Sequence, residues 1–121
     1  MRISSIYCAP EKSAFSRIDE IATATGRALG VDYNYGEWLP VDVMEVGFQP
    51  PEIRFQQPVY LRGPEKRLWE HTIREATPTI VQTGSASEDE VNSLLEEMRL
   101  AAEDERTLIA QWGMPGVIAV K

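Results

Sequence analysis

Hydrophobic and polar positions along the chain predict a fold in which helices predominate. Apolar residues recur at helical spacing in three segments, residues 13–30, 64–76 and 87–102. Ser13 is expected to cap the first helix and Gly30 to end it. Thr77-Pro78 interrupts or ends the second, and Ser87 with Glu90 forms a capping box at the start of the third. Two shorter helices are expected, one at 38–46 with Gly47 as its C-terminal cap and one at 104–110.

The same pattern predicts which faces are buried. The helix at 38–46 would bury Leu39, Val43, Met44 and Val46. The helix at 64–76 would turn Leu68, Trp69, Thr72, Ile73 and Ala76 inward. The last helix would bury Val91, Leu94, Leu95, Met98 and Ala102.

The clearest strand pattern covers residues 52–61. Its apolar face would consist mainly of Ile53, Phe55, Val59 and Leu61. Pro58 cannot donate to a ladder, so the strand lies at an edge or bends there. Short strands are also expected at 1–8 and 117–121. The expected fold is a single α/β domain over residues 1–121, in which a long helical insertion separates its two main strands.

Composition narrows the classes of partner. Among 121 residues there are 12 Lys and Arg against 19 Asp and Glu, a net charge of −7, which argues against nucleic acid or an anionic membrane as the main partner. One cysteine excludes an intramolecular disulfide framework, and one histidine leaves few ligands for zinc. No apolar run is long enough to span a membrane, and the N-terminus lacks the order of a signal peptide. A soluble, cytoplasmic protein is predicted.

Two residues carry possible acid–base or nucleophilic chemistry. His71 lies one turn from Glu75, so it is either a general base oriented by a carboxylate or a surface histidine near acids; the second interpretation is favoured. Cys8 would need a lowered pKa and a partner base to act as a nucleophile. Because no Cys-His motif is visible, a small buried residue is favoured for Cys8.

Aromatic residues offer a further site. An apolar ligand cavity with polar handles would suit Tyr33, Tyr35, Trp38, Tyr60 and Trp69. Core packing is the favoured alternative for each of them taken alone. The sequence contains no phosphate loop, dinucleotide fingerprint, serine-nucleophile elbow or metal-ligand cluster.

The order of several short segments resembles a known family. These segments are Tyr7-Cys8-Ala9-Pro10, Leu39-Pro40, Val46-Gly47-Phe48, the strand from Glu52, Gly84 to Glu88, and Met114-Pro115. Together they resemble the C-terminal half of class I S-adenosylmethionine-dependent methyltransferases, in particular the small-molecule branch. The resemblance covers nearly the whole chain. It implies part of a Rossmann-like fold, with residues 64–110 as a helical lid insertion and 117–121 as an antiparallel last strand.

The glycine-rich turn that holds the methyl donor in that family is missing from this sequence. S-adenosylmethionine is therefore expected as cofactor only if a partner or missing segment completes the site, and the chain alone is expected to be inactive. The chain is expected to be a fragment, one piece of a split enzyme, or a relic that binds without catalysis. The expected substrate-lining residues are Tyr7, Trp38, Tyr60 and Trp69, and His71 is the candidate catalytic base.

The missing part has a consequence for assembly. In the family the last strand lies between the fifth and sixth strands, so 117–121 would have an open apolar edge here, and such edges pair. A homodimer or a complementary methyltransferase half is therefore expected. The alternative function is a non-catalytic dimeric module that binds a small apolar ligand or serves as an interaction domain.

Overall fold

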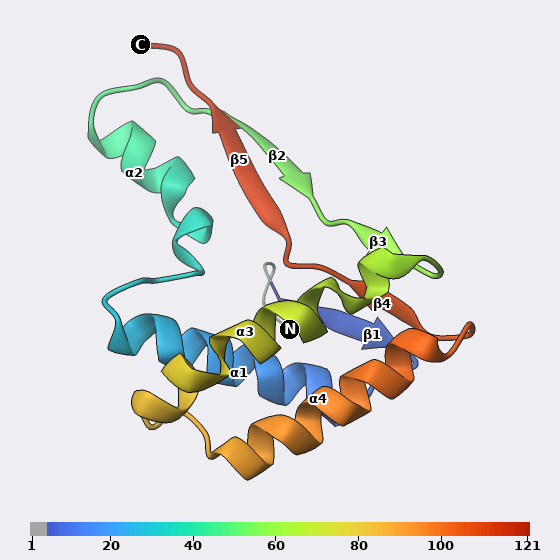
Figure 1. The fold of residues 1–121 in the computed structure, drawn as a ribbon. Helices are drawn as coiled ribbons and strands as arrows, with labels where there is room; N and C mark the ends of the chain where they lie inside the picture. Colours follow the sequence, from blue (N-terminus) through green and yellow to red (C-terminus); the bar gives the residue numbers. More distant parts are fainter. Residues whose placement is uncertain (1–4) are drawn as a thin grey trace.

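Three amphipathic helices pack against one another in the computed structural model, which describes residues 5–121 (Figure 1). They are α1 (Ser13–Ala28), α3 (Leu68–Gln82) and α4 (Glu88–Glu103). Each helix turns one apolar stripe inward, and the side chains that meet there are Phe15, Ile18, Ile21, Ile73, Ile80, Val91, Leu95 and Met98. All of these side chains are buried, at 0–3% exposure, so they form one continuous core.

A small antiparallel sheet packs onto this core. Its strands are β1 (Tyr7–Ala9), β4 (Leu108–Ala110) and β3 (Val59–Tyr60), in the order β1-β4-β3. Cys8 and Ile109 are paired across β1 and β4, and both side chains are part of the core. The strand predicted at 1–8 is thus observed only at its end, and residues 1–4 lie outside the described residues. We call these three helices and three strands the helical core.

The remaining elements form an arm that extends away from the helical core (Figure 1). We define the arm as residues 35–56 and 114–121. It contains the 3-10 helix η1 (Tyr35–Glu37), α2 (Leu39–Glu45), β2 (Glu52–Gln56) and β5 (Met114–Ile118). The strands β2 and β5 pair antiparallel as a second, two-stranded sheet. Within these four described elements no side chain is buried.

The Gln57 side chain joins the arm to the helical core. Both chain segments pass between the two sheets at this point, one after β2 and the other after β4. The Gln57 amide Nε2 donates to the carbonyl oxygens of Ser5 and Gln111, each at 2.9 Å. The backbone N–H of Gln111 donates in turn to the carbonyl of Pro58 at 2.9 Å. Gln57 therefore pairs with backbone carbonyls that would have no ladder partner where the chain passes from one sheet to the other. Pro58 lies at the bend, as its missing N–H predicts.

Several predicted helix boundaries are confirmed and others are wrong. Gly30 and Gly47 follow α1 and α2 with φ of +78° and +101°, a conformation that glycine adopts without strain. Ser87 caps α4 by accepting from the Glu90 N–H at 3.2 Å. Ser13 does not cap α1, because it is the first helical residue. Pro78 does not end α3, which continues to Gln82.

The helix predicted at 104–110 is wrong. The Asp104 carboxylate accepts from the N–H of Arg106 at 2.9 Å and from the hydroxyl of Thr107 at 3.0 Å, which fixes a turn. The backbone then enters β4 at Leu108. Lys66, in the 3-10 helix η2 (Pro64–Arg67), is buried and donates its Nζ to the Asp104 carbonyl at 2.8 Å, at the C-terminal end of α4. This places a cation where the helix dipole is negative.

The predicted burial fails in the arm and in the residues that follow β2. Leu39 and Val43 of α2 are only half-buried, and Met44 and Val46 are exposed, Val46 at 74%. The apolar face of 52–61 is also uncovered, because its members Ile53, Phe55, Val59 and Leu61 are all exposed. The alternation correctly identifies an apolar face, but in the described residues nothing covers that face.

In α3, Glu70 is buried where Leu68 and Thr72 were expected. Leu68 and Thr72 are exposed, whereas the Glu70 side chain is only 1% exposed. Its carboxylate accepts from Arg67 at 2.8 and 2.9 Å and from Arg74 at 3.1 Å. These charge-assisted bonds satisfy a carboxylate that would otherwise be costly to bury. Mainly because Arg67 donates to it, the pKa of Glu70 lies below its usual value of 4.5.

We predict that Glu70→Gln lowers the free energy of unfolding at pH 7 by about 2 kcal/mol, because it removes charge-assisted hydrogen bonds. A carboxylate with a lowered folded-state pKa stabilises the fold fully above its unfolded pKa. That stabilisation is lost as the pH falls below about 4.5. The difference between wild type and variant, measured by urea unfolding, should therefore shrink from pH 7 to pH 3.5. Glu75→Gln, on the exposed side of α3, is the control. A difference that stays constant with pH would contradict this account.

Candidate ligand-binding site

An aromatic cavity of about 250 Å³ lies between α1 and α3. Trp112, which follows β4, contacts both of the other rings that line it. The ring centroids of Trp112 and Trp69 are 4.4 Å apart and tilted by 58°, and those of Trp112 and Tyr33 are 5.2 Å apart and tilted by 39°. Its remaining walls are formed by Ala22, Thr25, Thr72, Ile73, Ala76 and Ile80. No ionisable side chain other than Tyr33 lines this cavity.

Gly26 allows Tyr33 to reach the cavity. A β-carbon at Gly26 would lie 2.6 and 2.7 Å from two carbons of the Tyr33 ring and 3.0 Å from the Val31 carbonyl oxygen. A glycine inside a helix costs about 1 kcal/mol relative to alanine, so its presence here needs a packing reason. That reason is the close approach of the chain after α1, where the Val31 N–H donates to the Gly26 carbonyl at 2.7 Å.

The polar groups of the cavity differ in whether they have hydrogen-bond partners. The Trp112 indole N–H donates to Asp19 Oδ1 at 2.8 Å. The hydroxyls of Thr25 and Thr72 donate to the carbonyls of Ile21 and Leu68, one turn back in their own helices, at 2.8 and 2.9 Å. The Trp69 indole N–H is enclosed and has no acceptor within residues 5–121. Trp69 is thus the one indole of the cavity whose donor is unsatisfied in the part of the chain that is described.

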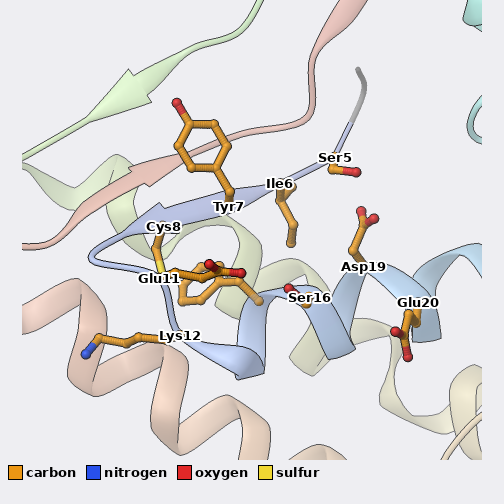
Figure 2. A pocket seen from close by; sticks show the side chains of 10 residues that line it. Ser5, Ile6, Tyr7, Cys8, Glu11, Lys12, Ser16, Asp19 and Glu20 are labelled. Atoms are coloured by element: carbon orange, nitrogen blue, oxygen red, sulfur yellow. The ribbon is translucent and has the colours of Figure 1, made fainter. Parts of the chain in front are cut away.

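A second hollow, of about 540 Å³, lies between β1 and the first half of α1 (Figure 2). Figure 2 shows Cys8 pointing from β1 toward α1, whereas the Tyr7 ring points away from α1. The Cys8 thiol donates to the Pro10 carbonyl at 3.3 Å, and burial raises the pKa of the thiol. A protonated, 3% exposed thiol is a packing residue and a poor nucleophile, as favoured from the sequence.

The predicted site residues are distributed over several elements. Trp69 lines the aromatic cavity together with Tyr33, both of them aromatics singled out in the sequence. Trp38 lies in the arm at the start of α2 and is 59% exposed. Tyr35 is also in the arm, where its hydroxyl donates to the Asp42 carboxylate.

Tyr7 and Tyr60 lie in the same small sheet but are not brought together. Tyr7 is level with Ala110 of β4, whereas Tyr60 is level with Ile109. Successive residues of a strand point to opposite faces, so the two tyrosines leave the sheet on opposite sides. Figure 2 shows the Tyr7 ring on the side away from α1.

His71 lies on the exposed side of α3 and does not line the aromatic cavity. In the part of the chain that the structure describes, no hydrogen bond or ion pair joins it to Glu75. Its neighbour Glu70 is engaged with Arg67 and Arg74 instead. The arrangement expected for an oriented general base is therefore not formed by these residues alone.

Trp112 is the cavity residue that the sequence reasoning missed. It lies two residues after the apolar run Leu108-Ile109-Ala110, which the sequence analysis places at the end of a helix. As a strand, that run places Trp112 beyond the sheet, where its ring meets Trp69 and Tyr33. The signal was present, because a short apolar run before a glycine at 113 is also compatible with a buried strand.

Comparisons with known proteins add no relative to this description. No protein-family model matches the sequence, and no curated protein matches it significantly. In residues 5–121, no helix is long and apolar enough to cross a membrane. Over the same residues, no group of three or more His, Cys, Asp or Glu side chains is placed to hold a metal ion.

We predict that Gly26→Ala destabilises the fold by about 1–3 kcal/mol, because the added methyl group overpacks the Tyr33 ring. Without that clash, alanine would be favoured in a helix. Displacing Tyr33 should also uncover Trp112 and shift tryptophan emission to longer wavelength. Urea unfolding and emission spectra measure the two effects. Ala24→Gly, on the exposed side of α1, is the control: it should lose helix propensity without changing the emission. A Gly26→Ala variant as stable as wild type would refute the close packing.

Proposed function

We propose that the chain is the substrate-recognition part of an S-adenosylmethionine-dependent methyltransferase. In this proposal the helical core, through its aromatic cavity, takes a small apolar methyl-accepting substrate. A partner chain or a further segment supplies the donor site, and the chain by itself is inactive.

The pairing of β2 with β5 carries the proposal. The two strands are antiparallel neighbours, with Ile53 opposite Val117 and Phe55 opposite Pro115. Between them the chain leaves the pair, forms α3 and α4, and returns. The resemblance implies this course: a helix from Leu39, a turn at Gly47, a strand from Glu52, a helical insertion and an antiparallel last strand. In the structure the last strand, β5, begins at Met114, three residues before the start that the resemblance implies. A mixed α/β fold with two small antiparallel sheets is observed, and the Rossmann-like sheet is part of the proposal.

The uncovered arm supports a missing partner. Val41 and Met44 of α2 are 45% and 41% exposed, and Ile53 and Phe55 of β2 are 59% and 44% exposed. An isolated two-stranded sheet is at best marginally stable in water. Several large apolar side chains left exposed in one arm favour a contact face there. A larger sheet and its helices would cover the arm.

The methyl donor does not fit the described residues. The connection from β1 to α1 runs through Pro10, Glu11 and Lys12 and contains no glycine, so its backbone does not form the close approach that a donor-binding turn requires. S-adenosylmethionine supplies the methyl group when it is bound to the complete enzyme. What this chain contributes is alignment of the methyl-accepting substrate, which accounts for much of the catalysis of such a transfer. His71 remains the candidate base, on an exposed face that a partner would have to meet.

A non-catalytic dimeric module is the second candidate. The same exposed arm favours it, because a second copy of the chain would also cover Val41, Met44, Ile53 and Phe55. The two candidates differ in what completes the sheet. A donor-binding half completes it in the first, and an identical arm does so in the second.

Calorimetric titration with S-adenosylhomocysteine, the product form of the donor, tests the proposal. The chain alone should show no binding at millimolar ligand. The chain joined to a donor-binding half encoded beside it should bind at micromolar ligand, and Trp69→Ala in that assembly should weaken affinity for the methyl-accepting substrate. Micromolar binding by the chain alone, or none by the assembly, would contradict the proposal.

Light scattering at tens of micromolar tests the dimeric module. A dimer, with no donor binding by the assembly, supports that module, and a monomer excludes it.

A further inference from the structure

The size of the aromatic cavity suits a small aromatic molecule. Its volume is about 250 Å³. Sites for drug-sized ligands occupy roughly 300–1,000 Å³, and an apolar cavity of ~150 Å³ holds benzene. A ring with a short substituent therefore fits this cavity.

The lining of the cavity selects for an uncharged occupant. Aromatic and aliphatic surfaces predominate, and neither a carboxylate nor a cationic group is among the lining side chains. The nearest acid joined to the cavity by a hydrogen bond is Asp19, which already accepts from Trp112. An ion entering this site would lose its hydration without gaining a counter-ion, and that loss is costly.

The Trp69 indole N–H supplies the one polar requirement. It is enclosed without an acceptor in residues 5–121, and leaving a buried donor unpaired is destabilising. The hydroxyl protons of Thr25 and Thr72 are already donated to backbone carbonyls. The nitrogen is closed to water in this structure, so a small rotation of the indole has to turn it toward the cavity. An accepting oxygen or nitrogen of a ligand would then satisfy the donor that the chain leaves unpaired.

We propose that the aromatic cavity binds a neutral, single-ring molecule that carries a hydrogen-bond-accepting oxygen or nitrogen, which receives the Trp69 N–H. The assignment of such a molecule as the methyl-accepting substrate rests on the proposed function. The binding itself does not, because every residue involved lies outside the arm, in the helical core or in the segments next to it.

A matched pair of probes tests the proposal on the chain as it is. Acetophenone and α-methylstyrene have nearly the same shape, but only acetophenone has an accepting oxygen. Affinities are measured by ligand-detected NMR for wild type, Trp69→Phe and Trp38→Phe. Trp69→Phe keeps an aromatic ring but removes the N–H. It should weaken acetophenone about three- to tenfold more than α-methylstyrene, as expected for one hydrogen bond. Trp38→Phe, in the arm, should change neither affinity.

A further variant, Ala76→Leu, keeps the test decisive if Trp69→Phe does not fold. Its larger side chain fills the cavity from α3 and should abolish binding of both probes. The proposal is overturned if Trp69→Phe weakens both probes equally, if Ala76→Leu leaves binding intact, or if neither probe binds wild type at millimolar concentration. Because no methyl donor is used, any of these results leaves the titration with S-adenosylhomocysteine unaffected.

Discussion

The burial of α1 against α3 and α4 is the interaction on which the rest of the structure depends. Ile18 and Ile21 of α1 are completely buried, and Val91 of α4 is buried beside them in the same core. Burying a side chain of this size stabilises a fold by about 1.5–3 kcal/mol. At the margin of this contact, Arg17 of α1 donates to Glu90 at 2.6 Å, which uses the carboxylate that would otherwise complete the capping box. The aromatic cavity exists because α1 and α3 are held at this separation.

What the sequence could predict depended on whether the signal was local. Gly30, Gly47 and Ser87 mark helix ends through their own backbone or side-chain chemistry, and the structure agrees with all three. The failures needed knowledge of the surroundings. An apolar face at Ile53 and Phe55 can be identified from alternation, but its cover cannot. Periodicity also gave no reason to bury a charged residue such as Glu70, because its two arginine partners become decisive only once the helix is packed.

The candidate site shows the same limit. Trp69 and Tyr33 were recognised by type as possible cavity residues, and Tyr7, Trp38, Tyr60 and His71 were chosen by the same criterion. Only packing separates the two groups. Trp69 and Tyr33 meet through Trp112, and that meeting requires the missing side chain at Gly26. No local pattern encodes a contact among three residues so distant in sequence.

Hydrogen exchange measures most directly whether the helical core is stable while the arm is only weakly held. Amides of β2 and β5 lie in a two-stranded sheet without buried side chains, so they should exchange by local opening. Amides of α1 and α4 should exchange only with global unfolding. In the dilute chain, the account predicts exchange at least about a hundredfold faster in β2 and β5 than in the two helices. Equal protection of the strands and helices would contradict it, because the arm would then be part of the same cooperative unit.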